Sequence, residues 1–145
     1  MKNLKILALL LAVALILPFA ASCGNTQEGT PNTFSDVTII TTYDPDAEPS
    51  TEEEAEEYEE TIFSGEVVVY TETETAEITV LDLLRAYADA KNVNLVYEED
   101  SNRVTKIGEI AAGGGYFWNY LVNGADAGLS TAISGDDEIR IVFTK

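Results

Sequence analysis

A single amphipathic helix, set between runs of β-forming residues, most constrains what this chain can fold into. The helix is predicted over Ile78 to Asn92, where Thr79 can cap its start and Asp82 completes a capping box. Apolar residues recur there at helical spacing, at Val80, Leu83, Leu84, Tyr87 and Ala88. Because this stripe occupies one side only, we expect the helix to cover one face of a sheet.

Runs rich in Val, Ile, Thr and aromatic residues lie on both sides of this helix. Two of them, Asp36–Tyr43 and Thr61–Glu72, precede it and predict a hairpin. The runs that follow it are Val93–Tyr97, Arg103–Ile110, Tyr116–Val122 and Glu138–Phe143. One helix packed against a mixed sheet predicts an α+β domain.

The predicted hairpin is interrupted by a strongly acidic segment. Residues 43–60 contain 10 acidic and no basic side chains, and we expect an insertion over residues 44–60. Like-charge repulsion and the lack of apolar residues favour a solvated loop. Calcium binding is the alternative, although the glycine and ligand spacing of an EF-hand loop are missing.

The N-terminus is typical of an exported protein. Lys2 and Lys5 precede a short apolar run, Ile6–Leu17, and small residues lead up to Cys23, the chain's only cysteine. "AASC" resembles the lipobox of bacterial lipoproteins, so we expect residues 1–22 to be a signal peptide and Cys23 to receive lipid. Ordinary cleavage after Ser22 is the alternative. An unpaired cysteine in an exported protein favours lipidation.

These boundaries predict a mature protein with a flexible tether, residues 23–35, and one domain, residues 36–145. Loss of the signal peptide removes two lysines and no acid, which changes the net charge from −18 to −20. So acidic a chain is not expected to bind nucleic acid. Attachment to the bacterial cell membrane, on its extracytoplasmic side, is therefore expected to depend on the lipid at Cys23.

Three short motifs of the predicted domain resemble the transcobalamin C-terminal-like domain. They are Thr79–Asp82 at the helix start, Trp118, Tyr120, Val122, Asn123 and Gly124 in a strand and its turn, and Gly135 and Asp136 before the last strand. The resemblance implies a β-grasp (ubiquitin-like) fold. In the animal cobalamin carriers such a domain closes over one face of the corrinoid. The resemblance thus implies cobalamin or a related corrinoid as the ligand, and no bound cofactor is otherwise expected.

The stretch "GGGYFWNYLVNG" supplies the candidate site residues. Alternation along a strand places Trp118 and Tyr120 on one face, which we expect under the helix, in the core or in a binding site. The candidates for ligand contact are Gly113, Gly114, Gly115, Tyr116, Phe117, Asn119 and Leu121. The glycines either let a ligand approach the backbone or form a flexible entry to the strand.

Catalysis is not expected of this chain. It has no histidine, its only cysteine is predicted to carry lipid, and it contains no Walker A or dinucleotide-binding motif. No metal site is expected either. Two function classes stay open: a surface-tethered module that binds a small molecule, and a protein-interaction or adhesion module of a cell-surface complex. A concave aromatic pocket would favour the first, and an exposed sheet edge the second.

Overall fold

The computed structural model describes residues 29–43 and 58–145. In chain order its elements are β1 (Thr30–Thr41), β2 (Glu60–Thr71), β3 (Ile78–Thr79), α2 (Val80–Lys91), β4 (Leu95–Glu98), β5 (Arg103–Ile107), β6 (Ile110–Ala111), β7 (Phe117–Val122), β8 (Ala125–Ala127), β9 (Ala132–Ile133) and β10 (Glu138–Thr144). The predicted signal peptide, Cys23 and most of the predicted acidic insertion lie outside the described residues.

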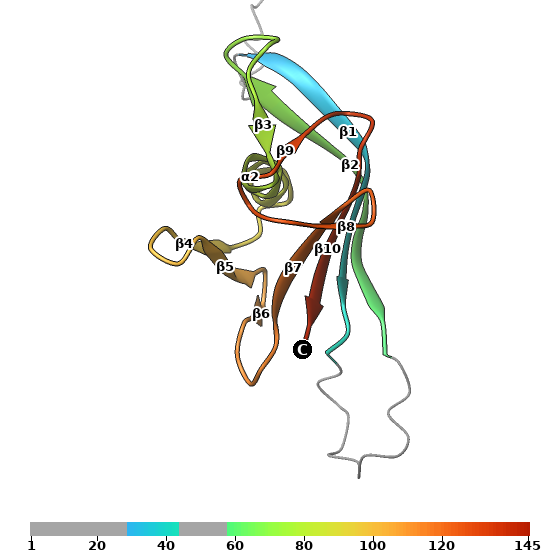
Figure 1. The fold of residues 1–145 in the computed structure, drawn as a ribbon, viewed down its shortest axis with the longest axis vertical. Helices are drawn as coiled ribbons and strands as arrows, with labels where there is room; N and C mark the ends of the chain where they lie inside the picture. Colours follow the sequence, from blue (N-terminus) through green and yellow to red (C-terminus); the bar gives the residue numbers. More distant parts are fainter. Residues whose placement is uncertain (1–28, 44–57) are drawn as a thin grey trace, which may run out of the picture.

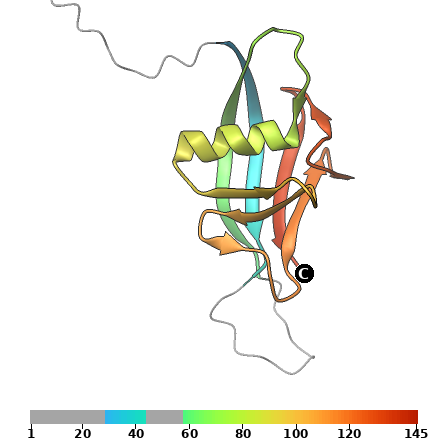
Figure 2. The ribbon, with the colours of Figure 1, turned by 90° about the vertical axis from the view of Figure 1, so that its left-hand side faces the viewer.

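The main sheet has five strands in the order β2-β1-β10-β7-β8. Strands β1 and β10 pair in parallel at its centre, and the other neighbours are antiparallel. The helix and the small sheet β4-β5-β6 lie on the same side of the main sheet (Figure 1). Figure 2 shows α2 running across the strands rather than along them. A mixed sheet with a helix on one face confirms the predicted α+β class.

The helix forms where the sequence predicts it. Thr79 accepts a hydrogen bond from the Asp82 N–H, and the Asp82 carboxylate accepts one from the Thr79 N–H, so the capping box is complete. At the other end Asn92 adopts a left-handed conformation with φ 53°, which suits a helix C-cap. The predicted stripe of five apolar residues is buried against the sheet.

The core lies between α2 and the inner face of the main sheet. Its fully buried side chains include Phe34 and Ile39 of β1 and Ile139 and Ile141 of β10. The last strand alternates as predicted, because Phe143 is also buried and lies on the same face. Burial of so many large apolar side chains stabilises the sheet and the helix together.

The predicted tether is too long. Residues 30–35 belong to β1, where they pair with β2 in the register Thr30↔Thr71 to Phe34↔Val67. Proline and asparagine, as at Pro31 and Asn32, are common in turns, so the sequence does not indicate a strand here. Proline is tolerated because β10 pairs only with the later part of β1, which leaves Pro31 with one neighbouring strand. The Asn32 amide donates a hydrogen bond of 2.9 Å to the Thr71 hydroxyl across the hairpin.

Other strand boundaries also differ from the prediction. The expected strand Arg103–Ile110 is two strands, since Gly108 at φ 60° turns the chain from β5 into β6. The short strands β3, β8 and β9 were not predicted, because two or three residues carry no clear alternation. The hairpin of β1 with β2 and the Asn123-Gly124 turn after β7 are confirmed.

Candidate functional site

The glycine stretch forms a hydrogen-bonded turn at one end of the domain. Gly113 N–H donates to the Tyr116 carbonyl at 3.0 Å, and Tyr116 N–H donates to the Gly113 carbonyl at 2.9 Å. Gly114 and Gly115 have φ of 61° and 90°, a backbone conformation that favours glycine. A Cβ added at Gly114 would meet no atom within 4 Å. At Gly114 the turn therefore presents its backbone to open space.

Tyr43 lies beside this turn because the end of β1 is fixed to the end of β10. The N–H and the hydroxyl of Thr42 both donate to the Phe143 carbonyl, at 2.9 and 3.2 Å. Tyr43 N–H then donates to the Thr41 hydroxyl oxygen at 3.0 Å. These bonds place the Tyr43 ring edge-on to Tyr116, with 5.1 Å between the ring centroids.

Four aromatic rings form a connected cluster at this end of the sheet. Tyr116 stacks on Phe143 with centroids 5.7 Å apart, and Trp118 contacts the same ring at 4.8 Å. Tyr43, at 6.4 Å from Phe143, is the outermost member and is 42% exposed. The cluster extends from the core to the surface, so it offers an aromatic wall to a ligand.

A cavity of about 750 Å³ opens against this cluster. Its lining comes mainly from β6, the glycine turn and the last residues of β1 and β10. These segments lie at the end of the domain that holds the C-terminus (Figure 1). We call this site the aromatic cavity. Its lining residues are Thr41, Tyr43, Glu60, Glu109, Ile110, Ala111, Gly113, Gly114, Tyr116 and Phe143. Glu60 and Glu109 are exposed and supply carboxylate acceptors beside the apolar wall.

The predicted site residues do not form one site. Gly113, Gly114 and Tyr116 line the aromatic cavity, whereas Gly115, Phe117, Asn119 and Leu121 do not. Phe117 is 46% exposed and Trp118 only 5%, in agreement with the predicted alternation of β7. Since side chains alternate along a strand, Phe117, Asn119 and Leu121 belong to the face turned away from α2.

Tyr120 lines a separate hollow of about 480 Å³, together with Phe117, Trp118 and Asn119. Burial raises the pKa of its hydroxyl to about 12, while a hydrogen bond with the Val104 backbone and the charge of Arg103 act in the opposite direction. The phenol is therefore neutral at physiological pH and links β7 to β5.

Sequence reasoning missed Thr41, Tyr43, Glu60, Glu109, Ile110, Ala111 and Phe143 as cavity residues. Most of them come from other parts of the chain, and the parallel pairing of β1 with β10 brings two of these parts together through Thr41↔Phe143. The available signal was the aromatic residue Tyr43, which ends the predicted strand Asp36–Tyr43. An aromatic residue at the end of a strand is a candidate for ligand contact. The sequence does not show which other strand lies beside it.

The motif residues that carry the family resemblance are largely structural. Asn123 donates its amide to Asp137 at 2.7 Å and accepts the Glu138 N–H at 3.0 Å, which fastens the β7–β8 turn to β10. Gly135 has no room for a side chain, because an added Cβ would lie 2.7 Å from the Thr33 carbonyl oxygen. These residues hold the sheet together, away from the aromatic cavity.

Comparison with known families finds no family model that matches the chain, and no curated protein matches it. The resemblance to the transcobalamin C-terminal-like domain therefore stays a prediction. Among residues 29–43 and 58–145, no group of three or more side chains could hold a metal ion. No helix in that part of the chain is long and apolar enough to cross a membrane.

Proposed function

We propose that this protein is a surface-tethered extracytoplasmic lipoprotein whose domain binds a small molecule in the aromatic cavity. The observation that carries the proposal is a concave site of about 750 Å³ with an aromatic wall and an open glycine turn. Small-molecule sites combine largely apolar walls with a few placed polar groups. Glu60 and Glu109 are such groups in this cavity.

We further propose a β-grasp fold and a corrinoid-like ligand. The order hairpin, helix, then further strands supports the fold, as does the parallel pairing of the first and last strands at the centre of the sheet. A corrinoid is a flat ring with amide side chains. Tyr43 and Tyr116 offer apolar surface to such a ring, and the two carboxylates could accept hydrogen bonds from the amides.

Binding by this domain alone is expected to be weak. A single domain covers one face of a flat ligand, so little of the ligand surface leaves water. We expect a dissociation constant that is micromolar or higher, which corresponds to a binding free energy of about −8 kcal/mol or weaker. High affinity would need a second protein surface on the other face of the ligand.

Paired tyrosine variants test the proposal by calorimetry with cobalamin and with a corrinoid that lacks the lower base. Tyr43 and Tyr70 are both 42% exposed, but only Tyr43 lines the aromatic cavity. Tyr43→Ala should weaken binding about tenfold, since stacking on an aromatic ring contributes about 1 kcal/mol or more. Tyr70→Ala is the matched control and should bind like the wild type.

Absence of heat with both corrinoids at millimolar concentration would contradict a corrinoid ligand. Equal weakening by Tyr43→Ala and Tyr70→Ala would instead contradict the aromatic cavity as the site. The other predicted function, a protein-interaction or adhesion module, gains support from the open edge of β2 described below. That the chain is not an enzyme stays a prediction.

A further inference from the structure

Strand β2 ends the main sheet, and none of the described strands pairs with its outer edge. Its second half, Glu66–Thr71, reads EVVVYT, a segment of high β-propensity with one charge. On the inner side this half pairs without interruption with β1, from Val67↔Phe34 to Thr71↔Thr30. An apolar edge strand is a ready template for another strand, and natural proteins usually protect such edges.

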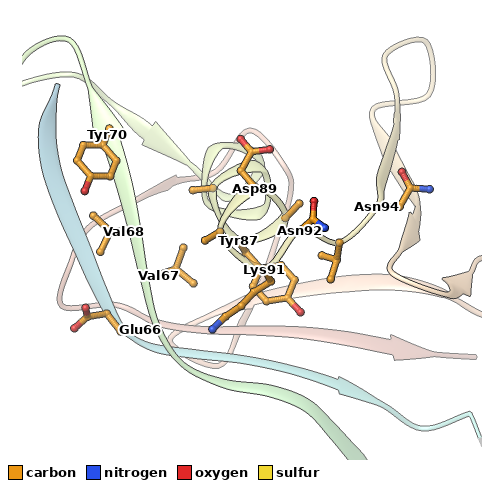
Figure 3. Close-up of a pocket in the computed structure, with 13 residues that line it drawn as sticks. Glu66, Val67, Val68, Tyr70, Tyr87, Asp89, Lys91, Asn92 and Asn94 are labelled. Atoms are coloured by element: carbon orange, nitrogen blue, oxygen red, sulfur yellow. The ribbon is translucent and has the colours of Figure 1, made fainter. Parts of the chain in front are cut away.

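A groove runs along this edge, between β2 and α2. It has a volume of about 940 Å³ and is lined by Glu66, Val67, Val68, Tyr70 and residues 86–94. Figure 3 shows Val67 pointing from β2 toward α2, whereas Glu66, Val68 and Tyr70 lie on the other side of the strand. An added strand would thus meet apolar side chains on both of its faces. We call this site the edge groove.

A second hollow of about 490 Å³ continues the edge groove toward the start of the helix. It shares Val68, Tyr70, Ala86 and Asp89 with the first. Together the two hollows follow β2 from Glu66 to Thr71, a length that suits an extended segment of several residues.

The charge along the edge groove is mainly negative. Its exposed acidic residues are Glu66, Glu72, Glu77 and Asp89. The two cations in the lining are each placed over an aromatic ring, Arg85 over Tyr97 at 5.7 Å and Lys91 over Phe63 at 5.1 Å. The field around the open edge therefore favours a cationic partner.

We propose that β2 binds an extended, lysine- or arginine-rich segment of another protein as a sixth strand of the main sheet. Backbone hydrogen bonds to the β2 edge would supply affinity, and apolar side chains alternating with cations would supply specificity. A second copy of this chain fits less well. It would bring Glu66 and the surrounding acids of two highly acidic molecules together, and like charges across an interface are unfavourable. The proposal does not rest on the small-molecule function.

The probe is a synthetic Lys-Val-Lys-Val-Lys-Val-Lys peptide, titrated into the isotopically labelled protein and followed by NMR and calorimetry. The amides of Glu66–Thr71 should show the largest shifts and become protected from hydrogen exchange. Replacing the central valine of the peptide by proline should weaken binding about tenfold, because the ladder is interrupted while the charge is unchanged. Equal binding of both peptides would reduce the effect to non-specific attraction and overturn the proposal.

Charge reversal on the protein locates the site. The double variant Glu66→Lys, Asp89→Lys should lose at least about tenfold in affinity, since two acids of the edge groove now repel the peptide. Glu99→Lys, Asp100→Lys is the matched control, with the same change of charge in the exposed turn after β4, and should bind like the wild type. Equal losses, or protection of the β2 amides by self-association without peptide, would overturn the proposal.

Discussion

Neighbouring aromatic residues of β7 have opposite environments. Trp118 lies in the core against Phe143, with its Nε1 buried and unpaired among the described residues, whereas the ring of Phe117 is nearly half exposed. Alternation alone predicts this division, because one face of β7 meets the core and the other meets water. The contribution of each ring to stability follows from its burial rather than from its chemical type.

Alanine variants of the two residues should separate these roles. Trp118→Ala is expected to lower the free energy of unfolding by about 3–5 kcal/mol, the usual range for removing a large buried aromatic side chain. Phe117→Ala should lower it by less than about 1 kcal/mol, as surface substitutions do. Chemical denaturation of both variants gives the comparison. A stable Trp118→Ala together with an unfolded Phe117→Ala would mean that the faces are reversed.

At the scale of elements, local patterns predicted the structure well and long-range pairing poorly. The helix follows from residues that lie within one turn of each other, from its cap at Thr79 to its end at Asn92. The start of β1 was missed because Pro31 and Asn32 favour turns, and only the register with β2 makes them a strand. The aromatic cavity was missed in part for the same reason. Its walls meet only after β1 and β10 pair across about a hundred residues of chain.

The turn around Asp137 joins two such distant elements and has a measurable pH dependence. Hydrogen bonds from the Ser134 backbone N–H, the Asn123 amide and the Ser134 hydroxyl lower the pKa of Asp137, although slight burial raises it. A carboxyl group with a lowered pKa in the folded state stabilises that state above its unfolded pKa of about 4. This stabilisation is lost as the pH falls through the lower folded pKa.

Asp137→Asn should therefore be less stable than the wild type at neutral pH, by about 1 kcal/mol for exposed bonds of this kind. The difference should shrink as the pH falls below about 4 and vanish once the wild-type carboxyl is protonated. Urea unfolding of both proteins across this pH range measures it. Asp136→Asn, one residue earlier, is the control for the loss of one negative charge in the same turn. A constant difference at all pH values would exclude the carboxylate charge as the cause.

On the scale of the whole molecule, the two candidate sites and the start of β1 lie in different places. Strand β1 has 12 residues and spans about 40 Å. It starts at the end of the domain opposite the glycine turn (Figure 1), and its last residue, Thr41, lines the aromatic cavity. The edge groove runs along the side, beside β2. Since β1 begins at Thr30, only six residues separate it from Cys23, with a reach of about 20 Å. Lipid at Cys23 would then hold the domain close to the membrane by the end remote from the cavity.

That arrangement depends on lipidation, which the Cys23→Ala variant tests. Wild-type protein should partition with the membrane fraction, and mass spectrometry should find lipid on the N-terminal cysteine. At least two acyl chains are expected, because one alone binds a membrane only marginally. Cys23→Ala should be released or left unprocessed, while Thr26→Ala, a small change in the same segment, should stay membrane-bound. Recovery of wild-type protein with a free Cys23 thiol would exclude the lipid anchor. The six residues between Cys23 and β1 would then no longer limit the distance between the domain and the membrane.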